Sequence, residues 1–401
     1  MSERSKLLLG VFAAALVLRV LILVQLLPQL RPEVDRDSYR ALARSLAVGK
    51  GYVAPDENGR ELPHVWLPPV YPLFLAALMK IGGDRLVLFL AVQCVLGAVA
   101  CVLTSVLAAR WLSWRLAAIA GLLVAIDPNC LLRCSDLSTE TVFTPLLVGG
   151  ACLLAWRRER TSAWFWCGLL WSVGALCRPI AVWLWIVALI VAVTWRQRLS
   201  VFAMFLAGFV PLLGIWAARN AALTGHWFVS TVATSNLFFY RAAGVEAERQ
   251  GVDIDEMIKR LRAEYADVQF FSTREQFDRD HDRLRRTSKE ILLSAPLIAF
   301  KQNAAGWGRV LFGPGLRGMH NILREPQRPY RWWPIYSAAL VLAVGLSIYG
   351  AVRLGREAVL VGFLALYFVA LAGGPSGSSR FRVPFTPMEA VLAVAGVTRR
   401  K

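Results

Sequence analysis

Residues 6–30, KLLLGVFAAALVLRVLILVQLLPQL, form a long, mostly apolar run behind a basic amino end, and residues 34–39, VDRDSY, follow shortly after it. A run of this length and hydrophobicity is typical of an α-helix that crosses a bilayer. The run has no small-residue cleavage site, so we expect a retained anchor and not a cleaved signal peptide. The carboxylates of Asp35 and Asp37 should therefore stand just beyond the end of a membrane helix.

The composition of the whole chain is that of a membrane protein and excludes an ordinary soluble domain. Of its 401 residues, 57% are hydrophobic and 18% are charged, and the mean hydropathy is +0.50. Several long apolar runs in such a chain indicate an all-α integral membrane protein. We attribute the net charge of +18 to Arg and Lys at helix ends and to contacts with anionic lipids, so nucleic acid is not expected as a partner. The seven Cys and four His are dispersed, and no metal site is predicted.

The apolar runs predict about ten transmembrane helices. We place them at residues 6–30, 86–109, 116–132, 142–156, 164–177, 180–195, 201–217, 335–352, 358–372 and 385–397. Every short connection assigned to the inner side carries Arg, as expected because cytoplasmic loops are enriched in positive charge. Both termini are therefore predicted to be cytoplasmic, with the protein in the plasma (inner) membrane. Residues 70–81 are apolar but too short to span, so we interpret them as a re-entrant or interfacial helix.

The chain is interpreted as one membrane module, residues 1–401, without a separate soluble carboxy-terminal domain. Residues 31–85 form the first extracytoplasmic loop, which we expect to be catalytic, and residues 219–334 form a large extracytoplasmic loop with helices. In the first loop, Asp37 is well placed to cap a short amphipathic helix at residues 38–48. Capping is the simplest structural role for this acid.

The large loop also contains signals for helices next to the membrane. Asp253 or Asp255 can cap a first helix, and the capping-box pattern Ser272-x-x-Glu275 precedes a second. Residues 295–312 are amphipathic and contain aromatic and basic residues, which is typical of a helix at the lipid boundary. We therefore expect extracytoplasmic juxtamembrane helices in addition to the membrane spans.

This topology gathers ionisable residues on the outer side from at least five separate connections. The acids are Asp35, Asp37, Asp127, Asp136 and Glu140, and the basic residues are Arg133, Arg178, Arg219, Arg380 and Arg382. Ionisable groups at membrane depth are costly and are seldom without a function. Arg binds phosphate oxygens bidentately, and a carboxylate can accept a proton from an attacking hydroxyl. The combination favours a reaction that handles a lipid-linked phosphate.

An ordered set of short motifs resembles the GT-C membrane glycosyltransferases that use polyprenyl-phosphate sugars. The branch most similar contains bacterial protein O-mannosyltransferase-like enzymes and the aminoarabinose transferase of lipid A. The motifs are the Asp35 to Tyr39 pattern, LARSLAVGKGY (42–52), PPVYPLFLAAL (68–78), DPNCLLRCSDLSTETVF (127–143), GALCRPIAV (174–182), RNAALTGHWFVST (219–231) and SRFRVPFTP (379–387). The resemblance implies a GT-C arrangement of about ten membrane helices over most of the chain.

The resemblance also implies roles for individual residues. Asp35 matches the acid of the first loop, which acts as general base on the acceptor or orients it, and Asp37 is the second choice. Glu140 matches the acid that follows the third span and is the third catalytic candidate. The residues implied in binding the substrate or its phosphate are Arg178, Arg219, Arg380, Arg382, His64, Tyr39 and Tyr71.

Structural roles remain open alternatives for several of these residues. An Arg at an outer helix end can be only a lipid headgroup anchor, and Glu140 can merely support the start of its helix. Asp127 can be only a turn residue before Pro128. Tyr39 and Tyr71 are more easily explained by packing or positioning than by catalysis.

The predicted function is transfer of a sugar from a polyprenyl-phosphate donor to an acceptor hydroxyl, with inversion, on the extracytoplasmic side. The acceptor can be a glycan, a lipid or a protein, and membrane lipids are the surroundings. No cofactor is predicted, although the acids could support a divalent cation. The alternatives are a multi-span transporter or flippase of lipid-linked glycan, a glycan polymerase or ligase, and a non-catalytic scaffold. The absence of an internal repeat disfavours the transporter.

Overall fold

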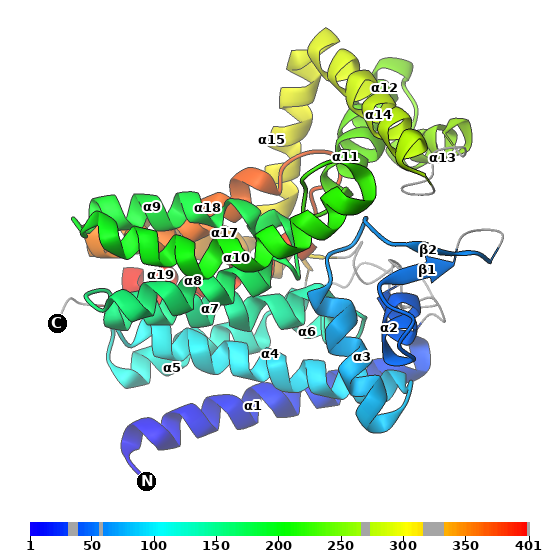
Figure 1. The fold of residues 1–401 in the computed structure, drawn as a ribbon. Helices are drawn as coiled ribbons and strands as arrows, with labels where there is room; N and C mark the ends of the chain where they lie inside the picture. The colour runs from blue at the N-terminus through cyan, green and yellow to red at the C-terminus, as the bar shows by residue number, and fades with distance from the viewer. Residues whose placement is uncertain (31–38, 56–58, 266–272, 316–332, 399–401) are drawn as a thin grey trace.

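The computed structural model describes residues 1–30, 39–55, 59–265, 273–315 and 333–398 (Figure 1). These residues are predominantly α-helical, which confirms the predicted fold class. The described part contains one small sheet, in which β1 (Val53–Pro55) pairs antiparallel with β2 (Glu61–Pro63).

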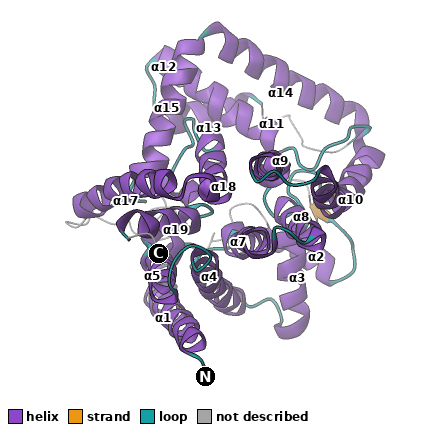
Figure 2. Ribbon diagram, turned by 90° about the vertical axis from the view of Figure 1, so that its left-hand side faces the viewer, coloured by secondary structure: helices purple, strands orange, loops and turns teal. Residues whose placement is uncertain are grey.

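In the described part of the chain, ten apolar helices run roughly side by side and form the bundle of Figure 1. They are α1 (Glu3–Leu26), α4 (Leu86–Ala108), α5 (Trp114–Ile126), α7 (Thr139–Arg157), α8 (Thr161–Ala175), α9 (Leu184–Thr194), α10 (Leu199–Thr224), α17 (Trp333–Leu354), α18 (Val359–Leu371) and α19 (Thr386–Val397). Each overlaps one of the predicted spans. The view along the bundle places α7 in the middle, between α4, α8, α18 and α19 (Figure 2).

Five segments of the described chain are long and apolar enough to cross a membrane. They are Glu3–Gln29, Leu86–Ala108, Thr139–Arg157, Leu199–Thr224 and Trp333–Leu371, the last of which contains both α17 and α18. The other bundle helices are apolar but shorter. The protein is therefore a multi-pass membrane protein, and the count of ten spans stays a prediction.

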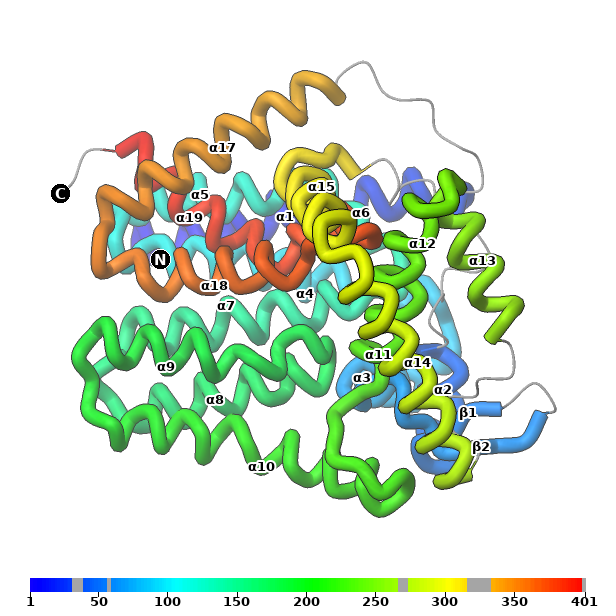
Figure 3. The backbone as a smooth tube through the Cα atoms, turned by 90° about the horizontal axis from the view of Figure 1, so that it is seen from above, coloured from blue at the N-terminus to red at the C-terminus, as the bar shows by residue number. Residues whose placement is uncertain are grey.

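The helices outside the bundle gather at the end opposite to the start of α1 and the end of α19 (Figure 1). They are α2 (Tyr39–Ala47), α3 (Val70–Gly82), α6 (Pro128–Leu132), α11 (Val232–Asn236), α12 (Ala243–Gln250), α13 (Ile254–Glu264), α14 (Arg274–Ser294) and α15 (Pro296–Phe312). Short segments η1 (Leu27–Gln29), η2 (Pro179–Trp183), η3 (Leu237–Ala242), η4 (Gly355–Ala358) and η5 (Ser379–Arg382) connect or extend the helices. Seen from above, α14 and α15 cross this end of the bundle (Figure 3). We call these helices the outer layer.

The predicted helix at residues 38–48 is present as α2, with Tyr39, Leu42 and Ala43 buried on one face. Its proposed cap, Asp37, lies outside the described residues. In the outer layer, Asp253 caps α13 by accepting a hydrogen bond from the amide of Asp255 at 2.8 Å, as expected.

Three predicted boundaries were wrong, each for a local reason. The span predicted at residues 116–132 ends at Ile126, because Pro128 disfavours helical backbone at Asp127, which instead caps α6. The span predicted to end at residue 217 continues as α10 to Thr224, where Gly225 with φ +84° ends it. The cap of α14 is Thr273, which accepts from the amide of Gln276, and not the predicted Ser272. Ser272 itself lies outside the described residues.

The contact between α8 and α10 depends on two glycines at the point where the helices cross. A Cβ on Gly168 would lie 2.1 Å from the carbonyl oxygen of Phe205, and a Cβ on Gly208 would lie 2.1 Å from that of Phe165. Small residues let membrane helices approach until their backbones touch, and van der Waals packing then holds them together. The crossing fixes α8, and with it the residues that follow α8 towards the outer layer.

Replacing Gly168 by Ala should destabilise the protein, because no space exists for the added methyl group. Overpacking of this kind costs about 1–3 kcal/mol. Gly214→Ala on α10 is the matched control, since a Cβ there meets nothing within 4 Å. Thermal unfolding in lipid nanodiscs compares the two variants. Equal unfolding midpoints would contradict the close crossing.

Candidate functional site

A buried carboxylate held by two arginines lies where the bundle meets the outer layer. Glu140, in the first turn of α7, is 0% exposed. Its Oε1 atom lies 2.7 Å from Nη1 of Arg178 and 2.5 Å from Nε of Arg380, and Nη2 of Arg380 donates to Oε2 at 3.2 Å. The hydroxyl of Ser138 also donates to Oε2, at 2.5 Å. The carboxylate is thus satisfied on both oxygens.

Three distant parts of the sequence supply this cluster. Arg178 follows α8 with extended backbone (φ −137°, ψ 113°), because Pro179 begins a new short helix and disfavours helical backbone at the residue before it. Arg380 lies on η5, between α18 and α19. Nη1 of Arg178 also donates to the hydroxyl of Thr139 at 3.0 Å, which fixes the guanidinium against the start of α7.

Both arginines of the cluster keep part of their side chains accessible to solvent. Two guanidinium groups face the single carboxylate of Glu140. The side chains of Arg178 and Arg380 are 11% and 33% exposed, so each retains an edge that a ligand can reach. Guanidinium groups at a partly dehydrated surface are suited to binding phosphate.

Arg382 was predicted to bind phosphate, but its guanidinium is fully buried among protein acceptors. Nη2 donates to the hydroxyl of Tyr336 at 2.9 Å, and that hydroxyl donates to Oδ2 of Asp127 at 2.8 Å. Nη1 donates to the last carbonyls of α15 and the residue after it, those of Val310 (3.1 Å), Leu311 (3.1 Å) and Gly313 (3.3 Å). Arg382 therefore joins α15, α17 and α6.

Arg219 lies within α10, where it holds the segment that contains β1 and β2. Its Nη1 donates to the carbonyl of His64 at 2.7 Å, and its Nη2 donates to the carbonyl of Tyr52 at 3.3 Å. The guanidinium also lies over the rings of Trp216 (4.9 Å) and Tyr52 (5.5 Å). The imidazole of His64 packs near Tyr52, with ring centres 5.9 Å apart. The hydrogen bonds of Arg219 thus hold backbone carbonyls of the β1–β2 segment.

The two predicted tyrosines lie in a packed layer beneath this segment. The hydroxyl of Tyr71 donates to Oε1 of Gln93 at 2.6 Å, and the amide of Gln93 donates to the carbonyl of Asp136 at 2.7 Å. Tyr39 packs edge-on against Tyr71, with ring centres 4.8 Å apart. Both tyrosines are buried. They connect α2 and α3 to the chain just before Glu140, in keeping with a packing or positioning role.

Asp35 and Asp37 lie outside the described residues, so their predicted catalytic roles stay predictions. Tyr39, the first residue of α2, is the nearest described position on their carboxyl side. Within the residues that the structure describes, no group of three or more His, Cys, Asp or Glu side chains is arranged to hold a metal ion.

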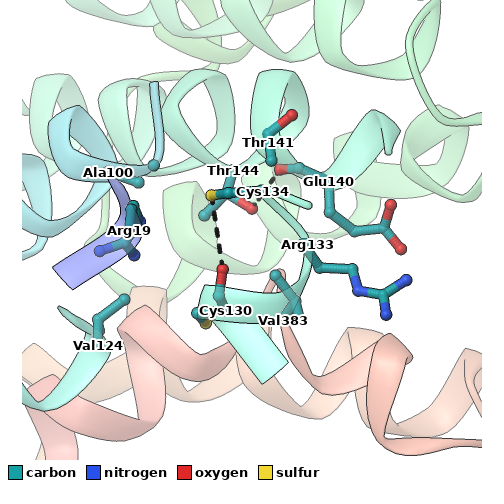
Figure 4. Close-up of a pocket in the computed structure, with 11 residues that line it drawn as sticks. Arg19, Ala100, Val124, Cys130, Arg133, Cys134, Glu140, Thr141, Thr144 and Val383 are labelled. Carbon is teal, nitrogen blue, oxygen red and sulfur yellow. Dashed lines mark hydrogen bonds between the residues drawn. The ribbon is translucent and has the colours of Figure 1, made fainter. Parts of the chain in front are cut away.

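Arg19 is the polar residue that the sequence reasoning missed. It is 2% exposed in the middle of α1, where Nη1 donates to the carbonyl of Ala15 at 3.1 Å and Nη2 to Sγ of Cys101 at 3.4 Å. Arg19 and Glu140 line opposite parts of a cavity of about 20 Å³, enough for about one water molecule (Figure 4). A charged residue inside the first apolar run was the signal available in the sequence.

Comparisons with known proteins find a family model that matches part of the sequence and solved structures with a similar fold over nearly the whole chain. Residues 67–218 match the family described as dolichyl-phosphate-mannose-protein mannosyltransferase, which is less than half of the chain but includes Glu140 and Arg178. No curated protein sequence matches.

Solved structures of an archaeal enzyme are similar over almost the whole chain. The apo oligosaccharyltransferase of Archaeoglobus fulgidus aligns with a TM-score of 0.58 and 12% identity, covering 98% of this chain and 50% of that one. The oligosaccharyltransferase AglB of the same organism, in complex with an inhibitory peptide and a dolichol-phosphate, aligns with a TM-score of 0.56 and 13% identity at the same coverage. This chain therefore spans about half the length of those structures. The likeness confirms the fold that the sequence resemblance predicted.

A weaker likeness is found to apo ArnT from Cupriavidus metallidurans. The TM-score is 0.43 at 14% identity, with 98% of this chain and 77% of that chain covered. A value this low supports no conclusion about shared structure.

Replacing Glu140 by Gln should destabilise the protein, because two guanidinium groups would lose their buried counter-charge. Breaking a buried pair by removing one partner costs about 3 kcal/mol or more. Glu357→Gln is the matched control, since Glu357 also lies between two arginines, Arg158 (2.9 Å) and Arg110 (4.0 Å), but is 39% exposed. An exposed pair contributes about 0–1 kcal/mol. The free energy of unfolding is measured for both variants. Similar losses of stability in the two would contradict a buried ion pair at Glu140.

His64 should make the folded protein sensitive to acid. Burial and the nearby Arg219 guanidinium lower the pKa of its imidazole from 6.5 to about 4. The unfolded chain binds this proton at a higher pH than the folded chain does, so stability falls as the pH drops from 6.5 towards 4. The loss between pH 7 and pH 5 should be about 2 kcal/mol.

The variant His64→Gln tests this linkage, because it removes the titrating group and leaves the backbone carbonyl that Arg219 uses. Unfolding midpoints at pH 7 and pH 5 should differ less in the variant than in the wild type. The same pH dependence in both proteins would disprove a buried neutral imidazole at this position.

Proposed function

We propose that this chain, a membrane protein of the GT-C glycosyltransferase fold, transfers a sugar from a polyprenyl-phosphate donor to an acceptor hydroxyl at the extracytoplasmic face. The observation that carries the proposal is the cluster of Arg178 and Arg380 around buried Glu140. Glu140 lies in the first turn of α7, and α7 begins at the end of the bundle opposite to the start of α1 and the end of α19 (Figure 1). Guanidinium groups are suited to binding phosphate, and a phosphate that is attached to a lipid can reach this cluster from the bilayer.

The arginine pair provides the electrostatic part of the reaction. When the bond between the sugar and its phosphate breaks, negative charge grows on the phosphate leaving group. The guanidinium groups of Arg178 and Arg380 would stabilise that charge. Fixed donors in a partly dehydrated site contribute more than they would in water, typically about 2–4 kcal/mol each to lowering the barrier. Because the pair is already oriented, little reorganisation is needed during the reaction.

Glu140 acts in this mechanism as the group that positions the arginines. Its two oxygens accept hydrogen bonds from both guanidinium groups and from Ser138, and the side chain has no exposure to an acceptor. A general base must reach the attacking hydroxyl. We therefore assign the base to the first extracytoplasmic loop, to Asp35 first and Asp37 second. Attack from the side opposite to the phosphate gives inversion at the anomeric carbon.

The other predicted binding residues are assigned to the frame of the site. Arg219 holds the carbonyls of Tyr52 and His64, and so keeps the β1–β2 segment over the start of the site. Arg382 fastens the end of α15, and Tyr71 connects α3 to the chain before Glu140 through Gln93. These side chains would affect the reaction through the position of the arginine pair and the first loop.

The names of the similar proteins support a lipid-phosphate donor. The matching family is described by its dolichyl-phosphate-mannose donor, and the AglB structure contains a dolichol-phosphate. The sugar and the acceptor, whether glycan, lipid or protein, belong to the proposal only as classes. The location in the plasma membrane, with cytoplasmic termini and an outward site, is also part of the proposal, supported by the arginines at the inner ends of the helices.

The first experiment follows sugar transfer from a panel of polyprenyl-phosphate sugars by purified protein in lipid nanodiscs. Arg380→Gln and Arg178→Gln should each lower kcat by about 10²–10³, as expected for the loss of one charge-stabilising donor. Asp35→Asn should abolish transfer while donor binding is retained. Arg110→Gln, which replaces an arginine bound to the carbonyl of Ala155 near the inner end of α4, is the control.

Several outcomes would count against the proposal. If the wild-type protein bound no donor, the transferase function would be rejected and a transporter would be favoured. Loss of transfer only in Asp37→Asn would move the base by two residues and keep the function. Arg380→Gln and Arg178→Gln variants as active as the control would show that the cluster has only a structural role.

A further inference from the structure

The loop that leads into Arg380 is held by an arginine of the outer layer. This loop, residues 372–378, joins α18 to η5. Arg309, in the last turn of α15, donates from Nε to the carbonyl of Gly377 at 3.0 Å. Its Nη2 donates to the carbonyls of Gly374 at 3.0 Å and Pro375 at 3.1 Å. A single guanidinium thus binds three carbonyls within four residues of the loop.

The contact between α15 and the loop is close as well as hydrogen-bonded. A Cβ on Gly306 would lie 2.3 Å from the carbonyl oxygen of Gly374, so only glycine fits at that position of α15. Gly374 itself has φ +106°, which a residue with a side chain rarely adopts. Arg241 on η3 adds a second hold, donating to the carbonyl of Gly373 at 3.2 Å and to Asn303 of α15 at 2.9 Å.

The hold is reciprocal. Arg309 reaches from α15 to the loop, and Arg382 reaches back from η5 to the carbonyls at the end of α15. Arg380 lies between these two attachments, three residues after Gly377 and two before Arg382. Because the chain is fixed on both sides of Arg380, little conformational entropy is lost when its guanidinium pairs with Glu140.

The sequence of the loop explains why such a hold is needed. Residues 373–379 read GGPSGSS. Gly and Ser give a chain many accessible conformations, and ordering each residue costs conformational entropy. The loop packs against α15 through Gly373 and Gly374. The bonds from Arg309 and Arg241 to its carbonyls add directional interactions that order it.

We propose that Arg309 is a positioning residue for the reaction, which orders the 372–378 loop so that Arg380 is presented to Glu140 and to the donor phosphate. The role of the donor phosphate in this inference rests on the proposed function, whereas the ordering of the loop by Arg309 does not. The guanidinium is suited to this task because its donors are planar and rigid, whereas a lysine has a single flexible charge. Arg309→Lys should therefore fail to replace it fully.

The test compares Arg309→Gln and Arg309→Lys with Lys301→Gln in lipid nanodiscs. Lys301 lies on the same helix, also carries one positive charge, and binds Glu248 instead of the loop. Hydrogen–deuterium exchange of peptides covering residues 373–382 should be faster by tenfold or more in Arg309→Gln than in the Lys301→Gln control. The ratio kcat/KM for the lipid-phosphate sugar should fall about tenfold in Arg309→Gln, and less in Arg309→Lys.

A double-mutant cycle separates positioning from general destabilisation. When Arg380 is already replaced by Gln, the further change Arg309→Gln should lower kcat/KM by less than about twofold, because the group to be positioned is gone. An equal tenfold loss in both backgrounds would overturn the proposal. Unchanged exchange in residues 373–382 would also overturn it.

The exchange measurement is independent of activity, so failure of the two proposals can be told apart. If the wild type transferred no sugar while Arg309→Gln still loosened the loop, the proposed function would fail and the positioning of Arg380 would stand. If transfer were present but insensitive to Arg309, the proposed function would stand and the role of Arg309 would be rejected.

Discussion

The ion-paired cluster of Glu140, Arg178 and Arg380 is the interaction on which the rest of the structure depends. A carboxylate at the end of a central membrane helix is unstable without opposite charge, and a lone guanidinium at that depth is equally costly. Pairing them joins the start of α7 to segments that lie 38 and 240 residues further along the chain. The first and last parts of the bundle meet at this point, which is why it is also the candidate site.

The arginines near the cluster differ in their roles, and each role can be recognised from the burial of the side chain and from its hydrogen-bond partners. Arg382 is fully buried and binds backbone carbonyls and Tyr336, so it holds elements together. Arg219 is spread over two carbonyls and two rings, and holds the β1–β2 segment. Arg380 pairs with a carboxylate but keeps about a third of its side chain exposed. A guanidinium group that remains partly accessible is suited to binding phosphate.

Periodicity and turn chemistry were enough to predict most helices, and tertiary contacts decided the exceptions. The helix expected at residues 38–48 is present as α2, because its apolar spacing leaves one face to bury. The prediction of one helix through residue 132 was wrong at Asp127, where the helix has already ended. The prediction followed the hydrophobicity of the segment, although Pro128 disfavours helical backbone at Asp127. Thr224 ends α10 only because Gly225 adopts left-handed backbone, so Arg219 lies inside the helix and not beyond it.

By itself, the sequence determined the all-helical membrane class, the order of the helices and the set of arginines and acids among which the site would be found. Hydrophobic length, positive charge at helix ends and short motifs are local properties, so they can be read along one chain. Only the tertiary structure decided that Arg380 meets Glu140, that Arg382 is enclosed and that Arg309 holds the loop between α18 and η5. These contacts depend on which backbone carbonyls and charged groups come within hydrogen-bonding distance once the helices have packed. The spacing of residues along the sequence does not determine those distances.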